Sequence, residues 1–261
     1  MSEVLGVDVS HYQGKIDWKQ VADSGKKFAI MKCQYEAQSH RIDETFEYNY
    51  EESGKYGLSR GVYIYIARAS MADPEKDARA LLEHLKGRPL EYGIWLDLED
   101  KSLREKGKAF IRNLAYFYAD IFMKAGYYVG IYCNRDWYIN LIHNDLKDDF
   151  EFWIARYPLK DTGEYNPFSI LKPEKYGVAW QYSSKGVVPG IPSKVDLDVD
   201  FDGIIVLTGA KKTNEQIAKE VLEGKWGTKN TNPTRKELLT RAGYDYEAIR
   251  KLVNAAYENK K

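Results

Sequence analysis

The stretch Gly93-Ile94-Trp95-Leu96-Asp97-Leu98-Glu99-Asp100 decides the fold, because a short apolar run within it turns acidic. Successive side chains of a β-strand point to opposite faces, so Trp95, Asp97 and Glu99 would share one face here. The two carboxylates then point the same way, from backbone positions roughly 6.6 Å apart. Repulsion between such groups raises the pKa of one and leaves the other ionised, which suits acid–base chemistry on a glycosidic bond. The alternative is an ordinary strand end whose acids only contact water.

The segments on both sides of this stretch alternate between apolar strands and amphipathic helices. We expect further strands over residues 4–10, 28–33, 60–66, 129–133, 152–157, 178–182 and 198–206. We expect helices over residues 17–24, 43–56, 73–85 and 108–124, and few after the middle of the chain. Repeated strand–helix units favour an α/β fold, an irregular TIM-like barrel with few helices, whose chemistry lies at the carboxyl ends of the strands. The acids at predicted strand ends are Asp8, Asp97, Glu99 and Asp196.

Composition excludes several classes of protein. The chain has 261 residues, of which 44% are hydrophobic, enough for one full-sized core and a small module. Its 39 basic and 39 acidic residues balance, so nothing favours a nucleic acid or a membrane surface as partner. No run approaches the roughly 20 apolar residues that a membrane-spanning helix needs. Cys33 and Cys133 each lie in an apolar stretch, so we interpret them as buried thiols.

Aromatic residues offer a second signal, because the chain contains 21 Tyr. Tyrosine combines an apolar ring with a hydroxyl, and carbohydrate sites use that combination. Aromatic candidates for substrate binding lie at or near predicted strand ends: Tyr63, Tyr132, Trp153, Trp180 and Tyr182. Packing within the sheet is the alternative for each of them. His11 is the only histidine near the predicted cleft, so we expect no metal and no cofactor.

The composition shifts after Gly209. Residues 210–214 form a short polar linker, which would separate a barrel over residues 1–209 from a module over residues 215–261. The apolar spacing in this tail predicts three helices, so we expect a small all-α three-helix unit.

Several strings resemble, in their order along the chain, the glycoside hydrolase family 25 lysozymes. The strings are 6–10 (GVDVS), 61–63 (GVY), 95–99 (WLDLE), 153–157 (WIARY), 180–182 (WQY) and 195–198 (VDLD). The resemblance covers roughly residues 4–208 and implies an irregular α/β barrel. It implies that Glu99 is the general acid, that Asp97 is its electrostatic partner, and that Asp8 and Asp196 are the remaining acids of the cleft. Asp198 stands where the family often has Asn, and it is the alternative to Asp196 as the fourth acid.

The same resemblance implies an N-acetylmuramidase whose substrate is bacterial peptidoglycan. Glu99 would protonate the leaving oxygen of the β-1,4 bond from N-acetylmuramic acid to N-acetylglucosamine. Our hypothesis is that the acetamido carbonyl of the substrate attacks the anomeric carbon while Asp97 stabilises the charged ring. The spacing of the carboxylates leaves a retaining and an inverting outcome open.

The tail resembles one repeat of the CW_7 cell-wall-binding family, in the strings 217–227 (IAKEVLEGKWG) and 238–246 (LLTRAGYDY). Such repeats bind the muropeptide part of peptidoglycan. A single weak site gains most from multivalency, so oligomerisation through this module is one hypothesis. A helical stability cap is the alternative. Trp226 distinguishes the two, because a partly exposed ring would bind sugar and a buried ring would belong to the core.

The start of the sequence has no basic and apolar leader pattern. We therefore expect synthesis in the host cytoplasm and action on the cell wall after holin-type release or lysis, as in a phage endolysin. The competing class is a catalytically silent protein that keeps the barrel to bind peptidoglycan.

Overall fold

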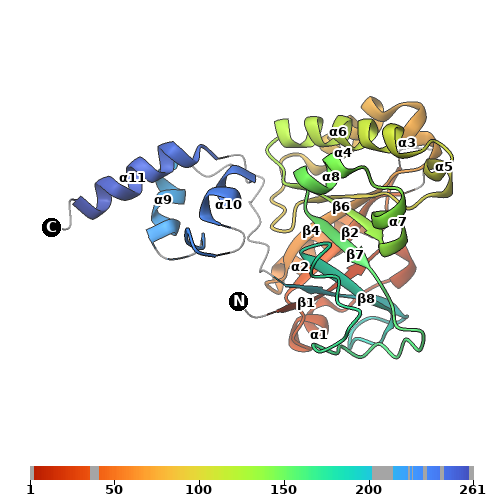
Figure 1. The fold of residues 1–261 in the computed structure, drawn as a ribbon. Helices are drawn as coiled ribbons and strands as arrows, with labels where there is room; N and C mark the ends of the chain where they lie inside the picture. The colour runs from red at the N-terminus through yellow and green to blue at the C-terminus, as the bar shows by residue number, and fades with distance from the viewer. Residues whose placement is uncertain are drawn as a thin grey trace.

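A closed barrel dominates the computed structural model, which describes residues 3–35, 41–201, 214–222, 224, 226–231, 234–241 and 244–258. The strands are β1 (Val4–Val9), β2 (Phe28–Tyr35), β3 (Arg41–Ile42), β4 (Ser59–Tyr65), β5 (Ile94–Asp97), β6 (Val129–Asn134), β7 (Phe152–Ala155), β8 (Ala179–Gly186) and β9 (Val195–Asp200). Their order is β1-β9-β8-β7-β6-β5-β4-β2-β3, and a further pairing of β1 with β2 closes the sheet (Figure 1). The predicted α/β barrel is confirmed, with β3 attached to the outside of the ring.

Strand β9 makes the barrel irregular. It pairs antiparallel with both β1 and β8, whereas β1, β2 and β4 to β8 form parallel pairs. The predicted last strand was misplaced, because β9 begins at Val195 and ends at Asp200. Three aspartates alternate with apolar residues along it, and a strand with so many acids does not look buried from its sequence. The predicted segment from 202 to 206 lies outside the described residues.

The helices of the barrel are α1 (Trp18–Asp23), α2 (Phe46–Lys55), α3 (Arg68–Ala72), α4 (Pro74–Leu85), α5 (Lys101–Arg104), α6 (Lys108–Lys124), α7 (Arg135–Asn140) and α8 (Asn144–Asp149). The predicted helices are confirmed: Asp73 caps α4 by accepting a hydrogen bond from the backbone N–H of Lys76, and α6 has the predicted ends. Helices α3, α5, α7 and α8 are too short to show a period and were missed. Figure 1 shows α3 to α8 gathered along one side of the barrel.

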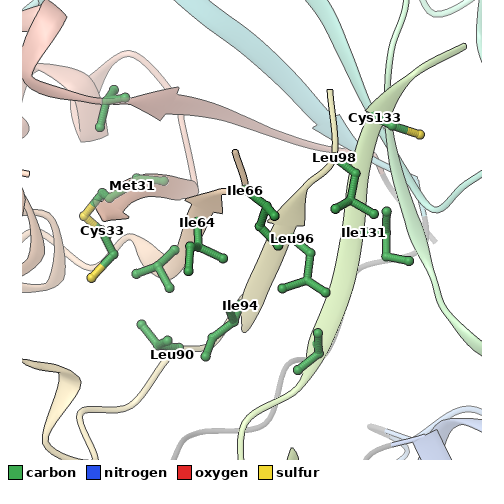
Figure 2. Packing of buried hydrophobic residues seen from close by; sticks show 14 of the residues in the cluster. Met31, Cys33, Ile64, Ile66, Leu90, Ile94, Leu96, Leu98, Ile131 and Cys133 are labelled. Carbon is green, nitrogen blue, oxygen red and sulfur yellow. The ribbon is translucent and has the colours of Figure 1, made fainter. Parts of the chain in front are cut away.

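The strands separate two apolar layers, as the alternation of residues 94–98 predicts. Trp95 lies inside the barrel with Phe28, Tyr92 and Trp153. Side chains of the opposite parity form the larger outer core; those labelled in Figure 2 are Met31, Cys33, Ile64, Ile66, Leu90, Ile94, Leu96, Leu98, Ile131 and Cys133. Both cysteines are buried and free, as expected. The inner face of each strand is therefore available to carry the residues of a functional site.

The C-terminal residues form a helical module with a core of its own. Its helices are α9 (Asn214–Leu222), α10 (Arg235–Arg241) and α11 (Tyr246–Glu258). Buried residues from all three helices, among them Ile217, Leu239 and Ile249, pack together in a cluster separate from the barrel. The predicted three-helix fold is confirmed, whereas most of the predicted linker lies outside the described residues and the domain boundary stays a prediction. Among the helices described in either part, none combines the length and apolar character that crossing a membrane requires.

Gly130 tests how tightly the barrel interior is packed. A Cβ atom added at this position of β6 would lie 2.4 Å from the ring of Trp95, which is fully buried and donates a hydrogen bond to the backbone carbonyl of Tyr92. We expect Gly130→Ala to lower the free energy of unfolding by roughly 1–3 kcal/mol, because the ring has nowhere to move. Thermal unfolding by circular dichroism measures this.

Gly54→Ala in α2 is the matched control. Its added Cβ would meet the end of the Arg60 side chain, 2.5 Å from Nη1, and not a ring enclosed in the barrel, and alanine is a better helix former than glycine. A stability loss in Gly54→Ala as large as that in Gly130→Ala would contradict the interpretation.

Candidate active site

A polar pocket of about 170 Å³ opens at the carboxyl ends of the parallel strands. It is lined by Asp8, Tyr63, Asp97, Glu99, Tyr132, Trp153, Tyr157, Gln181 and Asp196. The structure thus brings together all four predicted acids. Three of the five aromatic candidates, Tyr63, Tyr132 and Trp153, also line this pocket.

Backbone hydrogen bonds hold the segment from Asp97 to Glu99 on both sides. Asp97 ends β5, and its carbonyl accepts a hydrogen bond from the backbone N–H of Ile66, just beyond β4. The N–H of Leu98 donates to the carbonyl of Tyr132 in β6. The backbone between the two carboxylates is therefore fixed by neighbouring strands, and Glu99 leaves the sheet at the pocket.

The surroundings of Asp97 disfavour its ionised form. Burial raises the pKa of Asp97 well above its ordinary value, and the nearby charge of Glu99 raises it further. Lys32 opposes this effect by favouring the ionised carboxylate. Asp97 Oδ1 is buried and accepts no hydrogen bond from the described residues. An unpaired buried acceptor costs free energy, so this oxygen is suited to accept a hydrogen bond from a bound ligand.

Glu99 is tuned by burial and by its neighbour Asp100, which together raise the pKa of Glu99. Burial also tends to raise the pKa of Asp100, but hydrogen bonds from Ser102 and Tyr65 lower it below its ordinary value. The Tyr65 hydroxyl donates to Asp100 Oδ2 at 2.9 Å, and the Ser102 N–H donates to Oδ1 at 2.8 Å. Asp100 is thus held in its ionised form, and its charge favours the protonated form of Glu99, which suits a general acid. The sequence interpretation gave Asp100 no role.

The opposite wall carries a second group of acids from β1 and β9. Asp8 pairs with Asp196 across the two strands, and Asp198 is buried beside them. Burial first, then Glu99 and Asp161, raises the pKa of Asp196 to about 6. Burial and the charge of Asp196 raise the pKa of Asp198 to about 8. Asp196 therefore lines the pocket while Asp198 lies behind it.

Asp8 and Asp198 are neighbouring buried acids held by donors from other strands. Gln181 Nε2 donates to Asp8 Oδ2 at 2.7 Å, and Trp153 Nε1 donates to Asp198 Oδ1 at 2.9 Å. Burial, followed by the charges of Asp198 and Asp196, raises the pKa of Asp8 well above its ordinary value. Asp198 Oδ2 is buried and accepts no hydrogen bond from the described residues. Gln181 thus positions Asp8 in the pocket.

Two pocket residues were missing from the predicted site, Tyr157 and Gln181. The hydroxyls of Tyr132 and Tyr157 both donate to Gln181 Oε1, which fixes the amide so that its nitrogen faces Asp8. A signal for both existed in the sequence. Tyr157 has the parity of Trp153 along its strand, and Gln181 is a polar residue inside an aromatic strand.

Trp180 and Tyr182 do not reach the pocket, which corrects their proposed substrate contact. They lie on the outer face of β8, where both rings pack against Tyr165. Trp180 Nε1 donates to the backbone carbonyl of Arg156 at 2.7 Å. Gln181 between them points inward, so the alternation of the strand explains their position.

Trp226 belongs to the core of the helical module. It is 2% exposed, and its Nε1 donates to Glu220 Oε2 at 3.0 Å. The buried ring favours the core interpretation of Trp226 over a sugar-binding surface. The part of the chain that the structure describes holds no group of three His, Cys, Asp or Glu side chains arranged for a metal ion.

Comparison with known proteins agrees with this geometry. Residues 7–191 match the family model of glycosyl hydrolases family 25, which is more than half of the sequence. The chain belongs to glycosyl hydrolase family 25. Residues 215–256 match the model of the CW_7 repeat. Both resemblances found in the sequence are therefore confirmed.

Individual members of the family are distant in sequence. The autolytic lysozyme of Clostridium acetobutylicum is 29% identical over 203 residues, which cover 77% of this chain and 57% of that protein. Lysozyme M1 of Streptomyces globisporus is 26% identical, with coverage of 75% and 67%. The autolysin LytC of Streptococcus pneumoniae, solved with a synthetic peptidoglycan ligand, superposes with a TM-score of 0.61 at 25% identity. That match covers 76% of this chain and 46% of LytC, so this family 25 chain spans only about half of some relatives.

Asp198 gives a prediction on stability and pH. Its pKa is about 8 in the folded protein against an ordinary value of 3.8, so its contribution to stability is complete below pH 4 and is lost as the pH rises through 8. Asp198→Asn keeps an acceptor for the Trp153 N–H and carries no charge at any pH. We expect this variant to have the Tm of the wild type at pH 4 and a Tm roughly 3–5 °C higher at pH 9.

Asp198→Ala is the control, because it removes the hydrogen bond from Trp153 and should lower the Tm at both pH values. Equal Tm values of the wild type and Asp198→Asn at pH 9 would contradict the raised pKa of Asp198.

Proposed function

We propose that this protein is an endolysin-type lysozyme that hydrolyses the β-1,4 bond between N-acetylmuramic acid and N-acetylglucosamine in peptidoglycan. The observation that carries the proposal is the pairing in one pocket of Glu99, whose pKa is raised, with Asp97, whose Oδ1 lacks a donor among the described residues. Membership of glycosyl hydrolase family 25 supports the reaction class.

Glu99 is the general acid of the proposed reaction. It transfers its proton to the glycosidic oxygen as the bond from that oxygen to the anomeric carbon breaks. The departing sugar leaves with a free hydroxyl, and Glu99 becomes a carboxylate. Glu99 then takes a proton from the water that attacks the anomeric carbon, which returns the enzyme to its starting state.

The acetamido carbonyl of the substrate is the proposed internal nucleophile. Its oxygen bonds to the anomeric carbon in the first step and is displaced by water in the second. Asp97 Oδ1 would accept a hydrogen bond from the acetamido N–H and stabilise the positive charge that develops on the ring. The missing donor at this oxygen supports that role.

The remaining acids have supporting roles in this proposal. Asp8 and Asp196 line the wall opposite the β5 acids, where they would bind sugar hydroxyls. Tyr63, Tyr132 and Trp153 supply ring surfaces at the same pocket. Trp153 is 2% exposed, so only an edge of its ring is available to a substrate.

The biological setting belongs to the proposal as well. The CW_7 repeat would hold the enzyme on the wall, and a second copy joined through this module would strengthen that grip. Action after holin-type release or lysis from the host cytoplasm completes the endolysin role. Light scattering on the full chain checks the oligomeric state.

The decisive measurement is the release of reducing ends from purified peptidoglycan, with each new end identified by mass spectrometry. We expect new N-acetylmuramic acid ends from the wild type, and a rate on the order of a hundredfold or more lower for Glu99→Gln, because the amide cannot donate a proton to the leaving oxygen. Glu105→Gln is the matched control, since Glu105 is exposed beyond α5 and lines no part of the acid pocket.

A wild type that binds the wall without releasing reducing ends would instead establish the competing function, a catalytically silent peptidoglycan-binding protein. Ends of N-acetylglucosamine in place of N-acetylmuramic acid would contradict the bond specificity.

Asp97 separates the two retaining mechanisms. In the substrate-assisted route no bond forms between the enzyme and the sugar, so mass spectrometry of enzyme quenched during turnover should show only unmodified protein. Asp97→Asn should lower the rate roughly a hundredfold, because the amide no longer offsets the charge on the ring. A glycosyl adduct on Asp97 would overturn the substrate-assisted mechanism.

A further inference from the structure

Tyr12 is an exposed aromatic ring beyond the carboxyl end of β1, the strand whose Asp8 lines the acid pocket. It lies in η1 (His11–Gln13), a single 3-10 turn that begins where β1 ends, directly after the strand that carries Asp8. The residue is 75% exposed. Isolated exposed rings are common on protein surfaces, so exposure alone does not indicate a ligand site.

The backbone of Tyr12 is fixed from two directions. The N–H of Tyr12 donates to Ser10 Oγ at 3.3 Å, and the carbonyl of Tyr12 accepts a hydrogen bond from Ser193 Oγ at 3.3 Å. The neighbouring Gln13 Nε2 donates to the carbonyl of Lys194 at 3.1 Å. Ser193 and Lys194 lead directly into β9, which carries Asp196. Tyr12 is therefore tied to both strands that supply the acids of this wall.

The inner side of the Tyr12 ring rests on His11. The two ring centroids lie 4.1 Å apart, with an angle of 37° between the planes. His11 is fixed by Asp43, whose Oδ2 lies 2.8 Å from His11 Nδ1 and accepts the backbone N–H of His11 at 3.1 Å. Asp43 is itself buried. The turn thus holds the backbone of Tyr12 in place, and His11 supports one side of its ring.

We propose that Tyr12 is the stacking platform of an additional sugar subsite, which binds a ring of the glycan strand beyond the sugars at the scissile bond. The inference rests on the proposed function, because the ligand is the glycan of peptidoglycan. The pocket volume of about 170 Å³ is below the roughly 300–1,000 Å³ of ligand sites, so a glycan strand extends beyond the pocket. An uncharged ring suits the apolar face of a sugar, and a pre-positioned side chain loses little entropy on binding.

The test measures binding of soluble glycan strands whose stem peptides have been removed, so that the CW_7 module has no muropeptide to bind. All proteins are full-length and carry Glu99→Gln to prevent turnover. We expect Tyr12→Ala to weaken strand binding roughly 3- to 10-fold, the range for one aromatic contact. Tyr12→Phe should stay within about twofold of the parent, because the ring is kept. Phe168→Ala, which removes another exposed ring between β7 and β8, should bind like the parent.

Strand binding by Tyr12→Ala equal to that of the parent would overturn the subsite, and so would absence of binding by the parent itself. Equal losses in Tyr12→Ala and Tyr12→Phe would also overturn it, because the hydroxyl rather than the ring would then hold the sugar. Failure of the wild type to release reducing ends, with binding still dependent on the Tyr12 ring, would remove the proposed enzyme activity and leave the subsite in place.

Discussion

The burial of several carboxyl groups at one end of a barrel is the constraint on which the rest of this structure depends. For Asp8, Asp97, Glu99, Asp196 and Asp198, loss of water is the largest cause of the raised pKa, and their mutual repulsion adds to it. Hydrogen-bond donors from other strands offset this cost: Gln181 donates to Asp8, and Trp153 donates to Asp198. The β-sheet must be closed for these contacts to exist. Closure of the barrel therefore shapes the pKa values of these acids.

Much of this arrangement could be predicted from short-range patterns. Alternation along residues 94–99 placed Trp95 inside the barrel and put both acids at the pocket, and helix caps such as Asp73 marked helix ends correctly. The position of β9 could not be predicted in this way, because its buried acids are tolerated only where other strands neutralise them. Trp180 and Tyr182 were misjudged for a related reason: only the pairing of β8 with β7 and β9 shows which of its faces looks inward, and register shifts after Gln181 disturb that pairing. Trp226 was ambiguous because its burial depends on three helices at once.

Asp100 shows how a residue outside a pocket can govern it. Its carboxylate is committed to Tyr65 and Ser102 and does not line the cavity. Its charge nevertheless raises the pKa of Glu99. Asp100 is the N-cap of α5, and the N–H of Ser102 in that helix donates to its carboxylate. Asp100 thus adds to the effect of burial in favouring the protonated form of Glu99.

The antiparallel seam between β1 and β9 has a consequence for biosynthesis. Asp8 lies near the start of the chain and Asp196 near the end of the barrel sequence, yet the two residues face each other across this seam. Contacts between positions so far apart form late, because the whole intervening loop must close first. In a ribosome-bound chain whose β9 has not yet been synthesised, the barrel is open and the acids of β9 are missing from the pocket wall. The catalytic cleft is therefore assembled only when translation of the barrel is complete, and a truncated product carries no finished site.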